Sequence, residues 1–247
     1  MRQKLISKLK LFIGGFLTLN IVWYIAALLI NRKILVNPLS VYKDLPELMP
    51  NLGRHISASM MRIFWGVLIA SIVGIVIGIL LAYSKKISRF LNPFIYFAYP
   101  IPKLALLPVL MLLLGLGDAT KIAMVVLIIV FQIIVAVRDA VLNIPGETYH
   151  ILISKGASYG QILRYITLPA ILPECFTSLR IAIGTAISVL FFTETYGTRE
   201  GLGYFIMDAW MRLDYTAMYG AIIILSCIGF LLFMIIDLLN EYMCKWK

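Results

Sequence analysis

The side chains best placed to act on a solute lie in a long apolar run that prolines interrupt. Lys103 follows Pro100 and Pro102 within residues 90–114. Each proline removes a backbone donor and breaks a helix, and the freed carbonyls are tolerated at membrane depth only against protein or a water-filled cavity. We therefore predict that this break lines a translocation path and that Lys103 attracts an anionic substrate. The alternative is that Lys103 extends to a membrane interface.

Three more polar side chains lie within or just after the apolar run 176–192. A charge inside a membrane costs free energy and is usually kept for function. Glu194 is predicted either to line the outer part of the path or to cap the chain around Gly197. Thr185 and Ser188 are predicted either to face a polar path or to bond back to their own helix.

The sequence lacks the residue sets that catalysis or metal binding requires. Its two histidines and three cysteines stand far apart, with no metal-ligand spacing. No Gly-x-x-x-x-Gly-Lys-Ser/Thr phosphate loop occurs. We therefore expect no metal, no cofactor and no catalytic residue in this chain, and we expect any ATP hydrolysis to come from another subunit.

Composition places the chain in a lipid bilayer. Hydrophobic residues make up 62% of its 247 residues and charged residues 14%, against about 25% charged in soluble domains. This excludes a soluble enzyme, a nucleic-acid-binding domain and a disordered chain, despite the net charge of +10. A bilayer core needs about 20 apolar residues in a helix, and several runs come near this length. They are residues 11–30, 63–83, 90–114, 122–137, 176–192 and 218–239.

These runs predict an all-α membrane protein, a single domain over residues 1–247 with about six transmembrane helices. Residues 31–33 carry Arg and Lys rather than a small-residue cleavage site, so we expect the first run to be a retained span. Six spans put both termini on one side, where most of the lysine and arginine falls, which predicts that both are cytoplasmic. His55 and Arg62 are expected in a solvated outer loop.

Small residues recur every four positions in the second run, at Gly66, Ala70, Gly74 and Gly78. This spacing puts them on one helix face, where another helix can approach closely in lipid. The partner is expected to be a helix of the same chain, with a subunit interface as the alternative.

A polar stretch at residues 143–174 predicts two short helices. Pro145 followed by Glu147 is typical of a helix start, and Gly156 is well placed to end that helix. Ser158 and Gln161 have capping-box spacing for a second helix, which we expect Leu168 and Pro169 to stop. The hairpin is interpreted either as an amphipathic element lying on lipid or as a docking element for a cytoplasmic partner.

The second half of this stretch resembles the EAA loop of ABC-importer permeases, in which a glycine, nine residues and Ile-x-Leu-Pro follow one another. Gly156 and residues 166–169 match this pattern, and further pieces resemble the nitrate/sulfonate/taurine branch in the same order. These pieces are Pro-Ile-Pro-Lys-Leu-Ala at 100–105, Gly-Ala-Ser at 156–158, Leu-Pro-Ala-Ile-Leu-Pro at 168–173, Leu-Arg-Ile-Ala at 179–182 and Gly-Leu-Gly-Tyr at 201–204.

The resemblance implies a type I ABC-importer permease fold in the plasma (inner) membrane of a bacterium or archaeon. It implies that loop 147–169 is a coupling helix docked on a separate ATPase dimer that binds ATP and Mg²⁺. An extracytoplasmic substrate-binding protein and a second permease copy, most simply a homodimer, complete the assembly. The residues implied in coupling are Glu147, His150, Gly156, Ala157, Ser158, Tyr159, Ile166, Leu168 and Pro169. The Glu-Ala-Ala triplet itself falls on residues 150–152, so the polar contact of the family glutamate is expected either to be absent or to be replaced by His150 or Glu147.

The resemblance leaves the substrate open. The branch includes importers of nitrate, taurine and alkanesulfonates, and also of vitamin precursors such as thiamine pyrimidines or riboflavin. Lys103 favours a small anion. The alternative of another class is an ATP-independent secondary transporter, but such folds often break helices in both halves, and only one run is clearly broken here. A membrane enzyme and a recruiting scaffold leave the ordered motifs unexplained.

Overall fold

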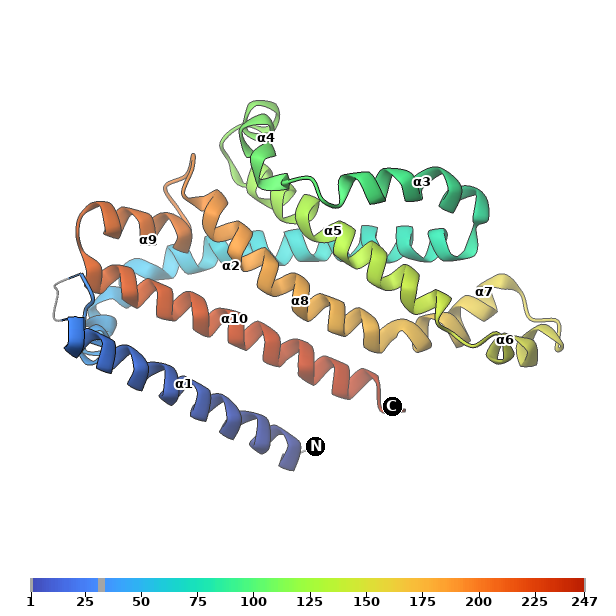
Figure 1. Ribbon diagram of the computed structural model, residues 1–247, viewed down its shortest axis with the longest axis horizontal. Helices are drawn as coiled ribbons and strands as arrows, with labels where there is room; N and C mark the ends of the chain where they lie inside the picture. The colour runs from blue at the N-terminus through green and yellow to red at the C-terminus, as the bar shows by residue number, and fades with distance from the viewer. Residues whose placement is uncertain (1, 31–33, 247) are drawn as a thin grey trace.

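The computed structural model describes residues 2–30 and 34–246, and within these ranges the chain is helical with no strand. Residues 31–33, which follow the first predicted span, lie outside the described residues. Figure 1 shows the long helices running roughly along the longest axis of the molecule. In chain order the helices are α1 (Arg2–Ile30), α2 (Pro38–Tyr83), α3 (Lys85–Ala98), η1 (Lys103–Leu106), α4 (Leu107–Leu114), α5 (Asp118–Leu142), α6 (Gly146–Ile153), α7 (Tyr159–Ile162), η2 (Leu163–Thr167), α8 (Leu168–Glu194), α9 (Leu202–Met211) and α10 (Tyr215–Met243).

Helix α2 begins much earlier than the predicted span 63–83. Asn37 caps it by accepting a hydrogen bond from the backbone N–H of Leu39 at 2.9 Å, and Pro38 occupies the first turn, where no donor is lost. Pro46 and Pro50 lie inside the helix without ending it. As a result, His55 and Arg62 lie on a helix and are buried, so the expectation of a solvated loop is wrong.

The third run is broken where the prolines predict it. Helix α3 ends at Ala98, and the chain resumes as η1 and α4 at an angle of 88°. Five helices of the described chain are long and apolar enough to cross a membrane, or six if this bent pair forms one span. The chain changes direction here because Pro100 and Pro102 both lack the backbone N–H that a continuing helix would need.

The small-residue face of α2 packs against α5. A Cβ built on Gly74 would lie 2.7 Å from Cγ2 of Ile133, and one on Gly78 would lie 2.8 Å from Cβ of Val137. Gly66 meets Val125 in the same way, and Ala70 is fully buried. These positions therefore let α2 and α5 approach closely within one subunit, and the core of the bundle forms where α8 packs against both of them.

Pro169 does not stop the helix that starts at Ser158, which corrects the predicted end. Helix α7 passes into α8 through a π-helical turn at Leu163–Thr167, in which the N–H of Leu168 bonds the carbonyl of Leu163. This wider i→i+5 turn accommodates the missing donor and the ring of Pro169 without ending the helix. The result is one continuous helical segment, Tyr159–Glu194.

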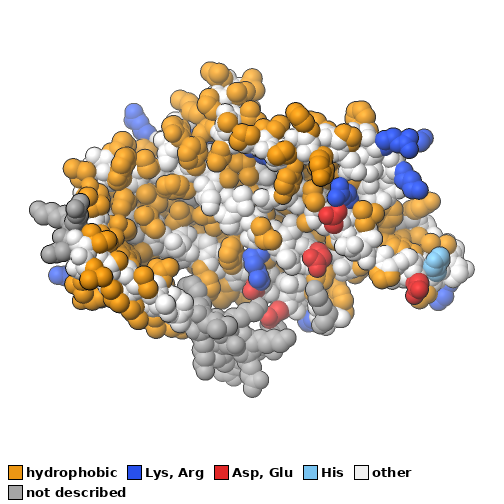
Figure 2. Space-filling model, in the orientation of Figure 1, with side chains coloured by type: hydrophobic (Ala, Val, Ile, Leu, Met, Phe, Trp, Pro, Cys, Tyr) orange, Lys and Arg blue, Asp and Glu red, His pale blue; other side chains and the backbone are white. Residues whose placement is uncertain are grey.

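The two ends of the bundle differ. The α6–α7 hairpin and the turn between α2 and α3 lie at one end, and the free ends of α1 and α10 point toward it (Figure 1). Helix α9 and the turn into α10 lie at the opposite end (Figure 1). Figure 2 shows hydrophobic side chains over most of the face viewed, with acidic, basic and histidine side chains together at the hairpin end.

Candidate functional site: the α6–α7 hairpin, the proline break and a buried ion pair

The α6–α7 hairpin is built by local capping, as the sequence predicts. Gly156 ends α6 with φ of +73°, a left-handed conformation that glycine adopts without strain. Ser158 then starts α7: its hydroxyl accepts the N–H of Gln161, and the Gln161 side chain accepts the N–H of Ser158 at 2.7 Å. These reciprocal bonds fix the reversal of direction between the two helices.

The hairpin presents a mixed apolar and polar surface. The side chain of Tyr159 is 85% exposed and that of Ile151 is 66% exposed. Glu147, His150, Gly156 and Ser158 are exposed as well. Of the other residues implied in coupling, Leu168 is exposed, Ala157 and Pro169 are half-buried, and Ile166 is buried. The structure thus gathers most of this set on one protruding element.

The hairpin is joined to α2 by a small hydroxyl network that the sequence did not reveal. Thr167 is fully buried, and its hydroxyl hydrogen-bonds the hydroxyl of Tyr83 at the end of α2. Tyr149 of α6 adjoins both groups. Burial raises the pKa of Tyr149, partly offset by its hydrogen bond to Thr167. Tyr149 is half-buried, because it packs toward this network.

At the proline break, Lys103 contacts the C-terminal end of α3. Its ammonium group donates to the carbonyl oxygen of Tyr99 at 2.8 Å and lies 4.9 Å from the centroid of the Phe131 ring. The lysine thereby satisfies a carbonyl that loses its helical partner at the break. Pro100 and Pro102 are exposed. The attraction of an anion by Lys103 stays a prediction.

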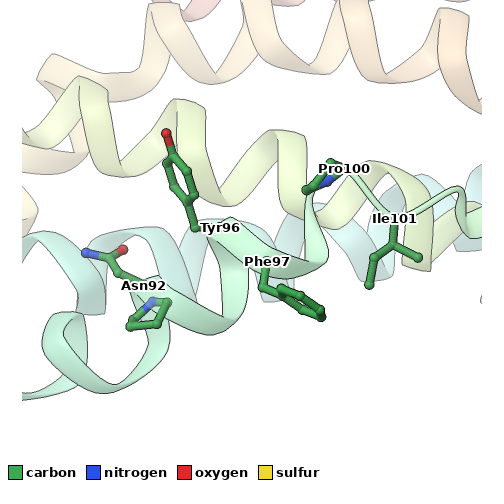
Figure 3. A pocket seen from close by; sticks show the side chains of 6 residues that line it. Asn92, Tyr96, Phe97, Pro100 and Ile101 are labelled. Carbon is green, nitrogen blue, oxygen red and sulfur yellow. The ribbon is translucent and has the colours of Figure 1, made fainter.

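A shallow pocket of about 730 Å³ adjoins the break. Figure 3 shows that Tyr96 and Phe97 point to opposite sides of α3, while Pro100 and Ile101 continue the wall beyond the helix end. Asn92 and Pro93 complete the lining, and Lys103 is not part of it. The pocket is almost entirely apolar, so it offers little to hold a charged ligand.

Thr185 and Ser188 bond back to α8. The hydroxyl of Thr185 donates to the carbonyl of Ile181 at 3.2 Å, and that of Ser188 donates to the carbonyl of Gly184 at 3.1 Å. Both side chains still reach the surface, with Ser188 the more exposed. Their oxygens are therefore left as acceptors on the outer face of the helix.

Glu194 lies inside the protein rather than on a path surface. Its side chain is 1% exposed, and that of its partner Arg62 is 3% exposed, with 2.6 Å between Nη1 and Oε1. The carboxylate also accepts the hydroxyl of Ser59 and the backbone N–H of Gly203, both at 2.9 Å. Of the two roles predicted for Glu194, a place on the path surface does not agree with this burial, because the near neighbours of the carboxylate lie in the subunit's interior.

Arg62 and the chain after α8 extend this cluster. Arg62 also donates to Asp118 of α5 at 2.7 Å and to the carbonyl of Glu200 at 2.8 Å. The N–H of Gly201 donates to Nδ1 of His55 at 3.2 Å. Gly201 has φ of +120°, and a Cβ there would lie 2.3 Å from Cδ of Glu194. The cluster therefore fastens α2, α5, α8 and the turn into α9 together.

The sequence held one signal for this cluster. His55, Ser59 and Arg62 are spaced four and three residues apart, which places them on one face of a helix. Among the residues that the structure describes, no group of His, Cys, Asp or Glu could hold a metal ion. The arrangement therefore consists of a protruding hairpin, a broken span and a buried ionic cluster.

Comparison with known proteins identifies the family. Residues 70–245 match the family model described as the binding-protein-dependent transport system inner membrane component. The chain belongs to this family. It is a permease subunit of a binding-protein-dependent ABC importer and a multi-pass membrane protein. This confirms the resemblance inferred from the ordered motifs.

Relatives of the permease cover nearly its whole length. It is 29% identical to the taurine transport system permease protein TauC of Escherichia coli (strain K12), over 99% of this chain and 92% of the relative. It is 28% identical to the formylaminopyrimidine transport permease protein ThiX of Halalkalibacterium halodurans, over 94% of each chain. It is 26% identical to the putative aliphatic sulfonates transport permease protein SsuC of Bacillus subtilis (strain 168), over 88% of this chain and 80% of the relative.

Solved structures establish the fold of the permease. Inward-facing MetNI, a methionine ABC transporter, aligns with TM-score 0.70 at 22% identity, over 80% of this chain and 98% of that chain. A bacterial ABC transporter for alginate aligns with TM-score 0.65 at 15% identity, over 98% of this chain and 99% of that chain. The permease therefore has the expected type I ABC-importer fold.

Proposed function

We propose that the permease takes its driving force from a separate ATPase dimer that docks on the α6–α7 hairpin. The observation that carries this proposal is the hairpin itself, which protrudes at one end of the bundle with Tyr159 85% exposed. Its caps fix its shape, and the π-helical turn continues it into α8. ATP and Mg²⁺ would be bound by the ATPase alone, with Glu147 or His150 supplying the polar contact.

The hairpin end is proposed to face the cytoplasm of a bacterial or archaeal cell. Helices α1 and α10 run so that their free ends point toward that end (Figure 1). Lys85, Lys86 and Arg89 at the turn between α2 and α3 and Lys155 beside Gly156 are exposed there. This distribution agrees with the preference of lysine and arginine for the cytoplasmic side. The opposite end, with α9, would then receive the substrate-binding protein.

The substrate is proposed to be a small anion such as a sulfonate, taurine or nitrate. TauC and SsuC are named for taurine and aliphatic sulfonates, and Lys103 at the break carries a charge of the right sign. A second permease copy, most simply an identical one, would complete the path along the break and α8, which includes Pro100, Pro102, Lys103, Thr185 and Ser188. A vitamin precursor is the alternative, because ThiX is named for formylaminopyrimidine.

Affinity purification in mild detergent tests the docking proposal. Wild-type permease should retain a P-loop ATPase, identified by mass spectrometry, and Tyr159→Glu should release it. Arg199→Glu is the matched control. It introduces the same glutamate side chain just after the far end of the continuous helical segment that begins at Tyr159. Wild-type permease that retains no ATPase but moves a solute down an ion gradient would overturn the proposal in favour of a secondary transporter.

A further inference from the structure

An exposed arginine lies near the middle of α8. Arg180 is paired with Asp237 of α10, but its side chain remains 47% exposed, against 19% for Asp237. A guanidinium at this depth in a spanning helix is costly unless it faces a partner or a wet cavity. Arg180 is thus unlike Arg62, whose side chain is 3% exposed and which is enclosed by the residues it bonds.

Arg180 lies beside two hydroxyl side chains on the surface of α8. Around the helix axis, Thr177 and Ser188 lie within about 80° of Arg180, whereas Thr185, five residues further on, lies about 140° away. All four side chains reach the surface. Thr177 donates its hydroxyl hydrogen to the carbonyl of Pro173 at 3.0 Å, and the other two hydroxyls bond back in the same way. Each hydroxyl hydrogen is therefore committed to a backbone carbonyl. Of these four side chains, only Arg180 offers donors to a ligand.

The chemistry of the pair fits reversible binding of an oxyanion. A guanidinium has five N–H donors in a planar fork, which matches sulfonate, nitrate or carboxylate oxygens in a bidentate way. Asp237 engages part of this fork, and the rest of the arginine side chain remains exposed. A carboxylate already in place competes with an arriving anion, so binding is weakened enough to allow release.

We propose that Arg180 is the contact for the anionic group of the substrate within the translocation path. Asp237 holds the guanidinium when the path is empty and is partly displaced when an oxyanion arrives. This inference rests on the proposed function, since it assumes that the face of α8 with Thr177 and Ser188 lines the path. It names the substrate class that this face accepts, a small solute with one sulfonate, nitrate or carboxylate-like group.

Anion-dependent thermal unfolding of the purified permease, with whatever ATPase it retains, tests the inference. The probes are taurine, ethanesulfonate, nitrate and bicarbonate, each titrated at constant ionic strength to obtain a Kd. At least one should protect the wild-type protein. Arg180→Gln should raise that Kd roughly tenfold or more, as the loss of a charge-assisted contact implies, and Arg180→Lys should fall between the two.

Asp237→Asn is the matched variant. It keeps the arginine and removes its competitor, so it should lower the Kd severalfold. A purely structural ion pair would instead make both variants less stable and leave anion protection unchanged. The inference is overturned if no probe protects the wild type, or if Asp237→Asn fails to tighten binding. Retention of the ATPase in the same samples reports separately on the proposed function.

Discussion

Loss of the Glu194 carboxylate should destabilise the permease far more than loss of an exposed charge. Glu194 and Arg62 are almost completely buried and 2.6 Å apart. Removing one partner of a buried pair leaves an uncompensated charge and costs about 3–5 kcal/mol. Glu194→Gln retains one acceptor oxygen for Ser59 and Gly203, and Arg62 keeps its bond to Asp118. The cost should therefore fall at the lower end, about 3 kcal/mol.

The double variant sharpens this prediction. Arg62→Met alone leaves Glu194 buried without its cation, for about 4 kcal/mol. Arg62→Met combined with Glu194→Gln buries no unpaired charge between these two positions, so its cost should stay near 3 kcal/mol rather than reach the sum. The coupling energy is then about 4 kcal/mol, far above the 0.3–0.5 kcal/mol within which independent sites add.

Reversible unfolding of the purified permease by SDS in mixed micelles, followed by tryptophan fluorescence, gives these free energies. Arg54→Gln is the control, because Arg54 and Glu200 pair at 3.3 Å with side chains 73% and 45% exposed. Such pairs contribute about 0–1 kcal/mol. Additive effects of the two substitutions, or a cost below about 1 kcal/mol for Glu194→Gln, would refute the claim that Arg62 and Glu194 form a stabilising buried ion pair.

Three further predictions follow from local geometry. Gly74→Val should lower thermal stability by about 1–3 kcal/mol by overpacking against Ile133, whereas Gly53→Ala, with open space at its Cβ, should raise it by up to about 1 kcal/mol. Gly156→Ala should cost about 1–2 kcal/mol because of the positive φ, and should reduce the ATPase retained on purification. Lys103→Gln should slow vesicle uptake of an anionic substrate severalfold, with Lys103→Arg as control; unchanged uptake in Lys103→Gln would remove this lysine from the path.

Features encoded by neighbouring residues could be predicted from the sequence. The glycine that ends α6, the capping box at Ser158 and the break after Ala98 each depend on residues within a few positions of one another. The four-residue spacing of Gly66 and its successors likewise indicated a close helix contact, and the structure supplies the partner, α5. Local rules decide such features because the relevant donors and acceptors are fixed by the backbone itself.

Features that depend on tertiary contacts could not be predicted from the sequence. The segment before residue 63 carries prolines and charges, so it is typical of a loop, and only packing against α9 and α10 shows it to be helix. Arg62 was therefore assigned to solvent, although Glu194 neutralises it across 132 positions of sequence. Pro169 was expected to end a helix, because nothing local indicates that a π-helical turn will accommodate it. The pairing of Arg180 with Asp237 could not be predicted for the same reason, since this partner on α10 is distant in sequence.

Because α7 continues into α8 without interruption, residues 159–194 form one long, rigid helical segment. Its 36 residues extend about 54 Å at 1.5 Å per residue. It is pinned to α2 near one end by Thr167 and Tyr83, and at the other end by Glu194 with Ser59 and Arg62. Because these two contacts lie far apart along the helix, they oppose sliding and rotation of α8 against α2. If force is applied at the hairpin, we expect α2, α5 and α8 to turn together as a single block. Opening is then expected where α1, α4 and α10 contact that block.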